Sequence, residues 1–92
     1  MSKAAIRPED ILPDSESFTD INGVTVRKGS IAAFLKNIDI FENSGALEQE
    51  KFAALDMLKK LAPAVVAAGL HKHADFKNKA VQAILDIEAA NL

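Results

Sequence analysis

The residues best suited to binding chemistry lie between a predicted strand and a predicted helix, and we call them the basic corner. The corner consists of Arg27, Lys28, Gly29 and Ser30. A helix start presents free backbone N–H groups and about half a positive charge, and here two cationic side chains precede it. This combination suits a phosphate, a carboxylate or an acidic peptide, including the acidic arm of the same or a neighbouring chain. The corner lacks the glycine density of a phosphate-binding loop, so a capped helix start with exposed cations explains the same residues.

A second polar and basic cluster lies at the start of the last predicted helix. It contains Lys72, Lys77, Asn78, Lys79 and Gln82, which are residue types that contact phosphates and base edges. With a short helix in front of it, the cluster is compatible with a helix-turn-helix recognition helix. Three lysines without an arginine, in a chain of net charge −2, make nucleic acid an unfavourable partner. A solvated helix face is the simpler interpretation.

Histidines and carboxylates give weaker indications of a reaction centre. In an extended loop His71 and His73 would point the same way, and Asp75 is the nearest residue that could join them in a metal site. Glu48 and Glu50 lie two apart on a predicted helix, so their carboxylates diverge. Because the chain also has no cysteine and no tyrosine, we predict a non-catalytic protein with no metal and no other cofactor.

The only strand signal spans residues 18–28, where Asn22-Gly23 separates two short runs of β-forming residues. Asn-Gly favours a type I′ turn, because both central residues of that turn have positive φ. The pattern predicts a hairpin with Ile21 opposite Val24 and with Val24 and Val26 on one face. An isolated two-stranded hairpin is marginal in water, so it must lie on the helices or pair with a second copy.

Helical periodicity follows the hairpin to the end of the chain. The interruptions in this periodicity predict three to four helices around one core, at about residues 30–42, 46–62, 63–69 and 75–90. Ser30 and Asp75 are the expected N-caps, and Ile40 falls off the apolar stripe of its helix. Residues 63–69 carry no polar side chain, so they must be buried in this core or against a second copy. The predicted fold class is therefore mainly α (α+β) with one hairpin.

Residues 1–17 form an acidic and largely irregular arm ahead of a single small domain at 18–92. Pro8 to Leu12 fits one helical turn with proline at its first position. The chain has no cysteine, no secretory leader and no apolar run long enough for a membrane span. We therefore expect a cytoplasmic protein without membrane contacts.

Two functions agree with these patterns. The favoured one is a small interaction or regulatory module that acts through protein–protein contacts of the hairpin and the apolar helix faces. A homodimer is expected, because a chain of 92 residues has a thin core and the hairpin has an unpaired edge. The alternative is a helix-turn-helix-like regulator that binds nucleic acid.

Overall fold

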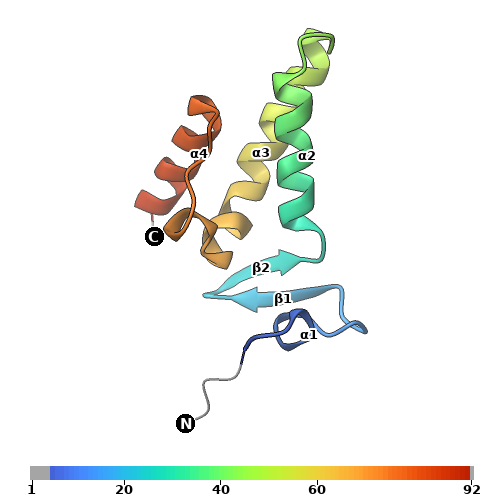
Figure 1. The fold of residues 1–92 in the computed structure, drawn as a ribbon, viewed down its shortest axis with the longest axis vertical. Helices are drawn as coiled ribbons and strands as arrows, with labels where there is room; N and C mark the ends of the chain where they lie inside the picture. Colours follow the sequence, from blue (N-terminus) through green and yellow to red (C-terminus); the bar gives the residue numbers. More distant parts are fainter. Residues whose placement is uncertain (1–4, 92) are drawn as a thin grey trace.

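The computed structural model describes residues 5–91, and within them it contains one hairpin, four α-helices and one 3₁₀ turn. In chain order these are α1 (Pro8–Ile11), β1 (Phe18–Ile21), β2 (Val24–Arg27), α2 (Ser30–Glu42), α3 (Glu48–Ala68), η1 (Leu70–Lys72) and α4 (Lys79–Ala90). α2 and α3 form an antiparallel pair, α4 lies beside α3, and the hairpin lies at the end where α3 finishes (Figure 1). The predicted mainly α fold with one hairpin is confirmed. None of the helices in residues 5–91 is long and apolar enough to cross a membrane.

The hairpin forms as the Asn-Gly turn predicts. Asn22 and Gly23 have φ values of 51° and 81°, and Ile21 pairs with Val24. One face is half-buried and is made by Thr19, Ile21, Val24 and Val26. β2 lies next to α3, and β1 is the outer strand (Figure 1). The helices of the same chain therefore support the hairpin, which is the first of the two expected arrangements.

The core lies where α2, α3 and α4 meet. Its largest fully buried side chains come from all three helices and are Phe34, Leu58, Val65, Val81 and Leu85. Phe34 also packs edge to face against the half-buried ring of Phe76, with 5.5 Å between the ring centroids. This aromatic contact holds the segment that precedes α4 against α2.

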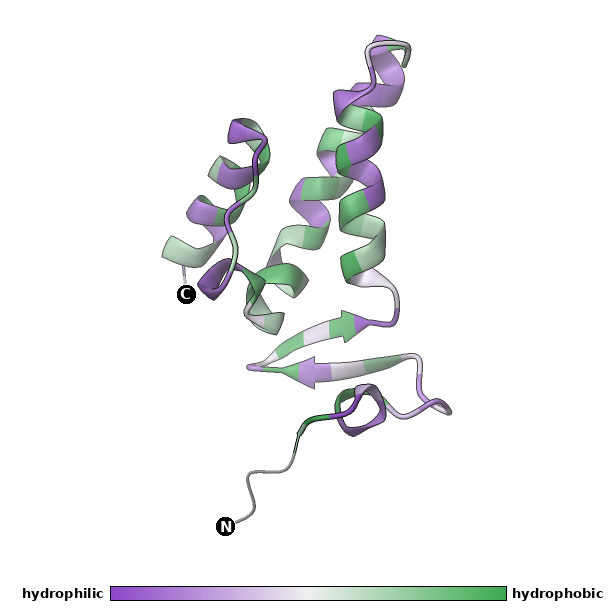
Figure 2. Ribbon diagram, in the orientation of Figure 1, coloured by the Kyte–Doolittle hydropathy of each residue, from purple (hydrophilic) through white to green (hydrophobic). Residues whose placement is uncertain are grey.

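α3 is one continuous helix through Pro63, so the predicted boundary between helices at 46–62 and 63–69 is wrong. A proline inside a helix removes one hydrogen bond and costs about 3 kcal/mol. The residues after it, Ala64 to Ala67, are all buried because α2, β2, α4 and η1 surround this end of α3. Burial of apolar surface contributes about 25 cal/mol per Å². Summed over the two alanines and two valines, this stabilisation exceeds the free-energy cost of the proline. The hydrophobic end of α3 beside β2 is visible in Figure 2.

The starts of α2 and α3 differ slightly from the prediction. Gly29, at φ 87°, is the N-cap of α2, so the expected cap Ser30 is instead the first helical residue. The buried Ser30 hydroxyl donates a hydrogen bond to the carbonyl oxygen of Arg27 at 2.7 Å, which fixes the turn from the strand into the helix. α3 begins at 48 instead of 46, because the Glu50 carboxylate accepts a hydrogen bond from the Leu47 N–H at 2.7 Å and caps the helix there.

α4 begins at Lys79, four residues later than the predicted start at 75. The cap is Asn78, whose Oδ1 accepts from the backbone N–H groups of Ala80 and Val81 at 3.0 and 3.1 Å. Asp75, the predicted cap, is exposed and makes no side-chain hydrogen bond with the described residues. The segment before α4 is non-helical, and Phe76 within it packs against Phe34 of α2.

The two capping residues can be compared directly. We expect Asn78→Ala to lower the free energy of unfolding by about 1–2 kcal/mol, because two backbone donors lose their acceptor. Asp75→Ala serves as the matched control and is expected to change it by less than about 0.5 kcal/mol. Urea unfolding followed by far-UV circular dichroism measures both changes. A larger loss in Asp75→Ala would contradict the cap assignment.

Candidate functional site

The structure brings the four predicted corner residues together at the start of α2. Arg27 ends β2, Lys28 and Gly29 form the turn, and Ser30 opens the helix. They line a shallow pocket of about 420 Å³. The other lining residues come from the arm, β2 and the first turn of α2, and they are Pro8, Leu12, Asp14, Val26, Ile31 and Ala32. We call this site the arm–corner pocket.

The arm of the same chain lies against the corner. The backbone N–H of Lys28 donates to the carbonyl oxygen of Ser17 at 2.8 Å, and Lys28 Nζ donates to the carbonyl oxygen of Asp14 at 3.2 Å. Leu12 is half-buried at the pocket. Both polar contacts use main-chain oxygens, and no ion pair joins the arm to the corner among residues 5–91. The corner therefore holds the arm by hydrogen bonding and packing, without neutralising its carboxylates.

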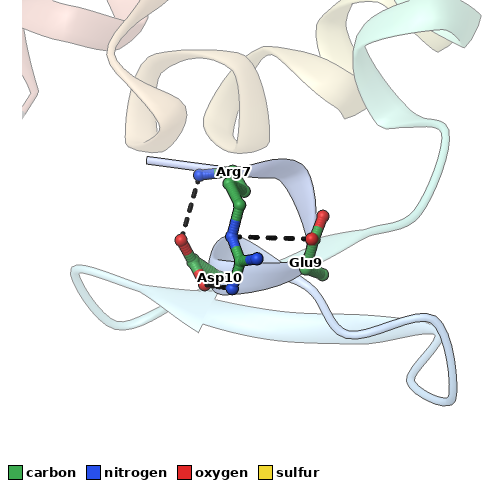
Figure 3. Close-up of polar contacts among 3 residues, drawn as sticks. All are labelled: Arg7, Glu9 and Asp10. Atoms are coloured by element: carbon green, nitrogen blue, oxygen red, sulfur yellow. Dashed lines mark hydrogen bonds and ion pairs between the residues drawn. The ribbon is translucent and has the colours of Figure 1, made fainter. Parts of the chain in front are cut away.

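Part of the charge of the arm is neutralised inside the arm itself. The Arg7 guanidinium lies 3.6 Å from the Glu9 carboxylate and 3.5 Å from the Asp10 carboxylate (Figure 3). The Arg7 backbone N–H also donates to Asp10 Oδ2 at 3.0 Å, which closes the single turn of α1. These pairs are exposed, so each contributes at most about 1 kcal/mol. They shape the turn and leave Asp14 and Glu16 as the arm carboxylates without an ion pair in the described chain.

The chemistry available at the arm–corner pocket is binding. The Ser30 hydroxyl donates to the Arg27 carbonyl, so its proton is not directed towards a base. No histidine lines the pocket. Arg27 and Lys28 are exposed at its rim and can attract an anion, although solvent screens such surface charges. The residues that line the pocket supply no nucleophile–base pair.

The second predicted cluster is divided between exposed cations and side chains with structural partners. Lys72, Lys77 and Lys79 are exposed. Asn78 caps α4 and also donates from Nδ2 to Glu42 Oε2 at 3.1 Å. Gln82 accepts from the Phe76 N–H at 2.6 Å and donates to Asp86 at 2.9 Å. The two amides that would read base edges are therefore occupied inside the fold.

The connection before α4 also differs from a helix-turn-helix motif. That motif joins its two helices by a turn of about 3–4 residues. Here α3 ends at Ala68 and α4 begins at Lys79, with η1 and an irregular segment between them. Neither the connection nor the amide contacts supports the nucleic-acid hypothesis.

The two histidines lie in different surroundings. His71 is half-buried within η1, and its Nδ1 atom is buried without a hydrogen-bond partner, whereas His73 is exposed. The 3₁₀ turn replaces the extended loop that would align their imidazoles. Among residues 5–91, no three histidine, aspartate or glutamate side chains are placed to hold a metal ion.

The feature that sequence reasoning missed is an apolar groove between α2 and α3, near the loop that joins them. It has a volume of about 560 Å³. Its lining residues are Asn37, Ile40, Asn43, Gly45, Ala46, Glu50, Ala53, Ala54 and Met57. Ile40, the residue that falls off the core stripe, was the available signal. We call this feature the α2–α3 groove.

Comparison with known proteins assigns no family to this arrangement. No protein-family model, curated protein or solved structure matches the chain.

The contact between arm and corner predicts a change in protease sensitivity. Lys28→Glu removes the Nζ donor to Asp14 and places a negative charge beside an acidic arm. Because one hydrogen bond of about 1 kcal/mol corresponds to about fivefold in an equilibrium, we expect cleavage at Glu16 by a glutamate-specific protease to accelerate by about that factor. Lys36→Glu, the same charge change on an exposed position of α2, is the control. Equal cleavage rates in the two variants would refute the arm contact.

The lysine cluster predicts a negative result with duplex DNA. With three lysines and a negative net charge, we expect fluorescence anisotropy of a labelled duplex to show no complex in the range of about 10⁻⁴–10⁻⁶ M that is typical of non-specific binders. A complex that weakens steeply with salt and disappears on combining Lys72→Ala, Lys77→Ala and Lys79→Ala would instead support the nucleic-acid function.

Proposed function

We propose that this chain is a small, non-catalytic interaction module of the cytoplasm that associates with itself. The supporting observation is the number of large apolar side chains that its own fold leaves uncovered. In residues 5–91 nine of them are at least 41% exposed: Ile6, Ile11, Phe18, Leu35, Ile40, Leu47, Phe52, Met57 and Ile87. Scattered single apolar residues are normal on a protein surface, but contiguous groups of them mark interaction sites. Ile40 and Met57 form such a group, since they line the same groove.

The chain is also less compact than an average monomer of its mass. The chain exposes 6675 Å², whereas a folded monomer of 9.9 kDa is expected to expose about 5,200 Å². Its radius of gyration of 14.6 Å likewise exceeds the value of about 12 Å expected for this length.

Two of the sequence arguments for a dimer carry less weight in this structure. Ala64 to Ala67 are buried by other elements of the same chain, so they do not require a second copy. The hairpin lies on α3 and does not need intermolecular pairing for support. Self-association is instead favoured by the exposed side chains of the two long helices.

Mass measurement tests the proposal directly. We expect light scattering on a sizing column, at micromolar chain concentrations, to give about twice the chain mass of 9.9 kDa and to fall towards that mass on dilution. The mass should be insensitive to salt, because apolar burial is not screened by ions. A mass of one chain at every concentration would refute self-association and assign the exposed side chains to a different partner.

A further inference from the structure

We propose that Asn22 is a modification site, at which the backbone nitrogen of Gly23 displaces the side-chain amide and the asparagine is deamidated without an enzyme. Asn22 and Gly23 are the two central residues of the turn between β1 and β2, and both are exposed. This turn lies at the opposite end of the strands from the basic corner (Figure 1). The proposal concerns the chemical ageing of the folded chain and does not depend on self-association.

The reaction requires only water and a base from the solvent. The Gly23 nitrogen loses its proton to the base and forms a bond to the side-chain carbonyl carbon of Asn22. The bond between that carbon and the amide nitrogen breaks, and the nitrogen takes up a proton and leaves as ammonia. The product is a five-membered succinimide ring. Water then adds to one of the two ring carbonyls and opens the ring to aspartate or isoaspartate, and no atom is oxidised or reduced.

The attacking nitrogen is unhindered and makes no backbone hydrogen bond. Glycine has no Cβ, and a Cβ built on Gly23 would have no atom within 4 Å apart from those of its chain neighbours. The strand pairing of this hairpin ends at Ile21 and Val24, so it does not include Gly23. Among the turn and loop hydrogen bonds of the described residues, none uses the Gly23 N–H. The nitrogen is therefore accessible to a base from the solvent.

The Asn22 side chain is free to react, in contrast to the asparagines of the helices. Within residues 5–91 it makes no side-chain hydrogen bond, whereas Asn37, Asn43 and Asn78 bond to backbone groups at 2.8, 2.9 and 3.0 Å. The residues that follow those three are isoleucine, serine and lysine, each of which has a Cβ beside the attacking nitrogen. Deamidation there must break a hydrogen bond and overcome this steric hindrance. Asn22 is consequently the favoured site.

The two products affect the turn differently. Asn22 and Gly23 have φ values of 51° and 81°, as a type I′ turn requires. Aspartate followed by glycine also favours this turn, so the aspartate product is compatible with the hairpin. Isoaspartate carries the main chain through its side chain, which adds one carbon to the backbone between Ile21 and Val24. The turn then no longer has two-residue geometry, and the register that pairs Ile21 with Val24 is lost.

The contact of the hairpin with α3 depends on this register. The half-buried face of the hairpin contains Ile21, Val24 and Val26, and β2 is the strand beside α3. Because side chains alternate between the two faces of a strand, a shift of register turns these residues away from the helix. Isoaspartate at position 22 therefore releases the hairpin from the helices, while the core made by α2, α3 and α4 remains.

Peptide mapping by mass spectrometry, after incubation of the folded chain in mildly alkaline buffer, tests the site. The tryptic peptide that ends at Arg27 contains Asn22 as its single asparagine and has no glutamine. We expect Asn22 to convert at least about tenfold faster than Asn37, because a hydrogen bond of about 1 kcal/mol and the following isoleucine both slow the reaction at Asn37. A rate at Asn22 no higher than at Asn37 would overturn the proposal.

Asn22→Gly is the matched control, because a Gly-Gly pair also accepts the type I′ turn but carries no amide. This variant should release ammonia only at the slow rate of the remaining asparagines, and release at the wild-type rate would overturn the assignment to Asn22. Far-UV circular dichroism shows whether the variant is folded. If it is not, the comparison of Asn22 with Asn37 in the wild-type chain decides alone.

Hydrogen exchange tests the structural consequence. Asn22→Asp reproduces the aspartate product, and chromatography separates the isoaspartate form from the aged wild-type chain. We expect the hairpin amides to exchange at least about fivefold faster in the isoaspartate form than in Asn22→Asp, because each lost hydrogen bond contributes about 1 kcal/mol. The amides of α3 should exchange equally in both. Equal exchange of the hairpin amides would overturn the loss of register.

Discussion

The fold depends on burying the C-terminal end of α3 on every side. Val65 and its neighbours offer no polar face that could be turned towards water. α2, α4, β2 and η1 all pack against α3, and around this end they leave Ala64 to Ala67 almost fully covered. The same requirement explains why the helix continues through Pro63 and stops at Gly69, whose positive φ lets the chain turn back along the core. Concentrating the packing at one end leaves α2 and α3 covered less completely near their connecting loop.

Local signals predicted the elements whose boundaries depend on local physics. The Asn-Gly turn specifies the hairpin register, because few residue pairs accept two consecutive positive φ angles. The predicted helix at 30–42 matches α2, since a glycine precedes it and the Asn43–Gly45 turn follows it. The wrong predictions concern places where contacts between residues far apart in the sequence determine the structure. Pro63 is tolerated because of burial, and Phe76, which precedes α4, packs against Phe34 of α2. Neither tertiary effect is visible from neighbouring residues.

The candidate sites likewise include features that the sequence predicts and features that only the structure reveals. The four corner residues are consecutive, so the chain itself ensures that they meet, but sequence could not show that main-chain oxygens of the arm would engage Lys28. Asn78 and Gln82 have the residue types of base-reading side chains, and only the structure shows their hydrogen bonds to be used internally. The α2–α3 groove escaped detection because Asn37 and Glu50 interrupt its apolar pattern. The side chains of Asn37 and Glu50 instead bond to the backbone of their own helix or helix start.

The two ends of the molecule carry separate surfaces. The hairpin, α1 and the arm–corner pocket lie at one end, and the α2–α3 groove lies near the loop at the other (Figure 1). The two surfaces share no lining residue. A partner that covered the groove would therefore leave the arm in contact with Lys28 of its own chain, through the main-chain oxygens of Asp14 and Ser17.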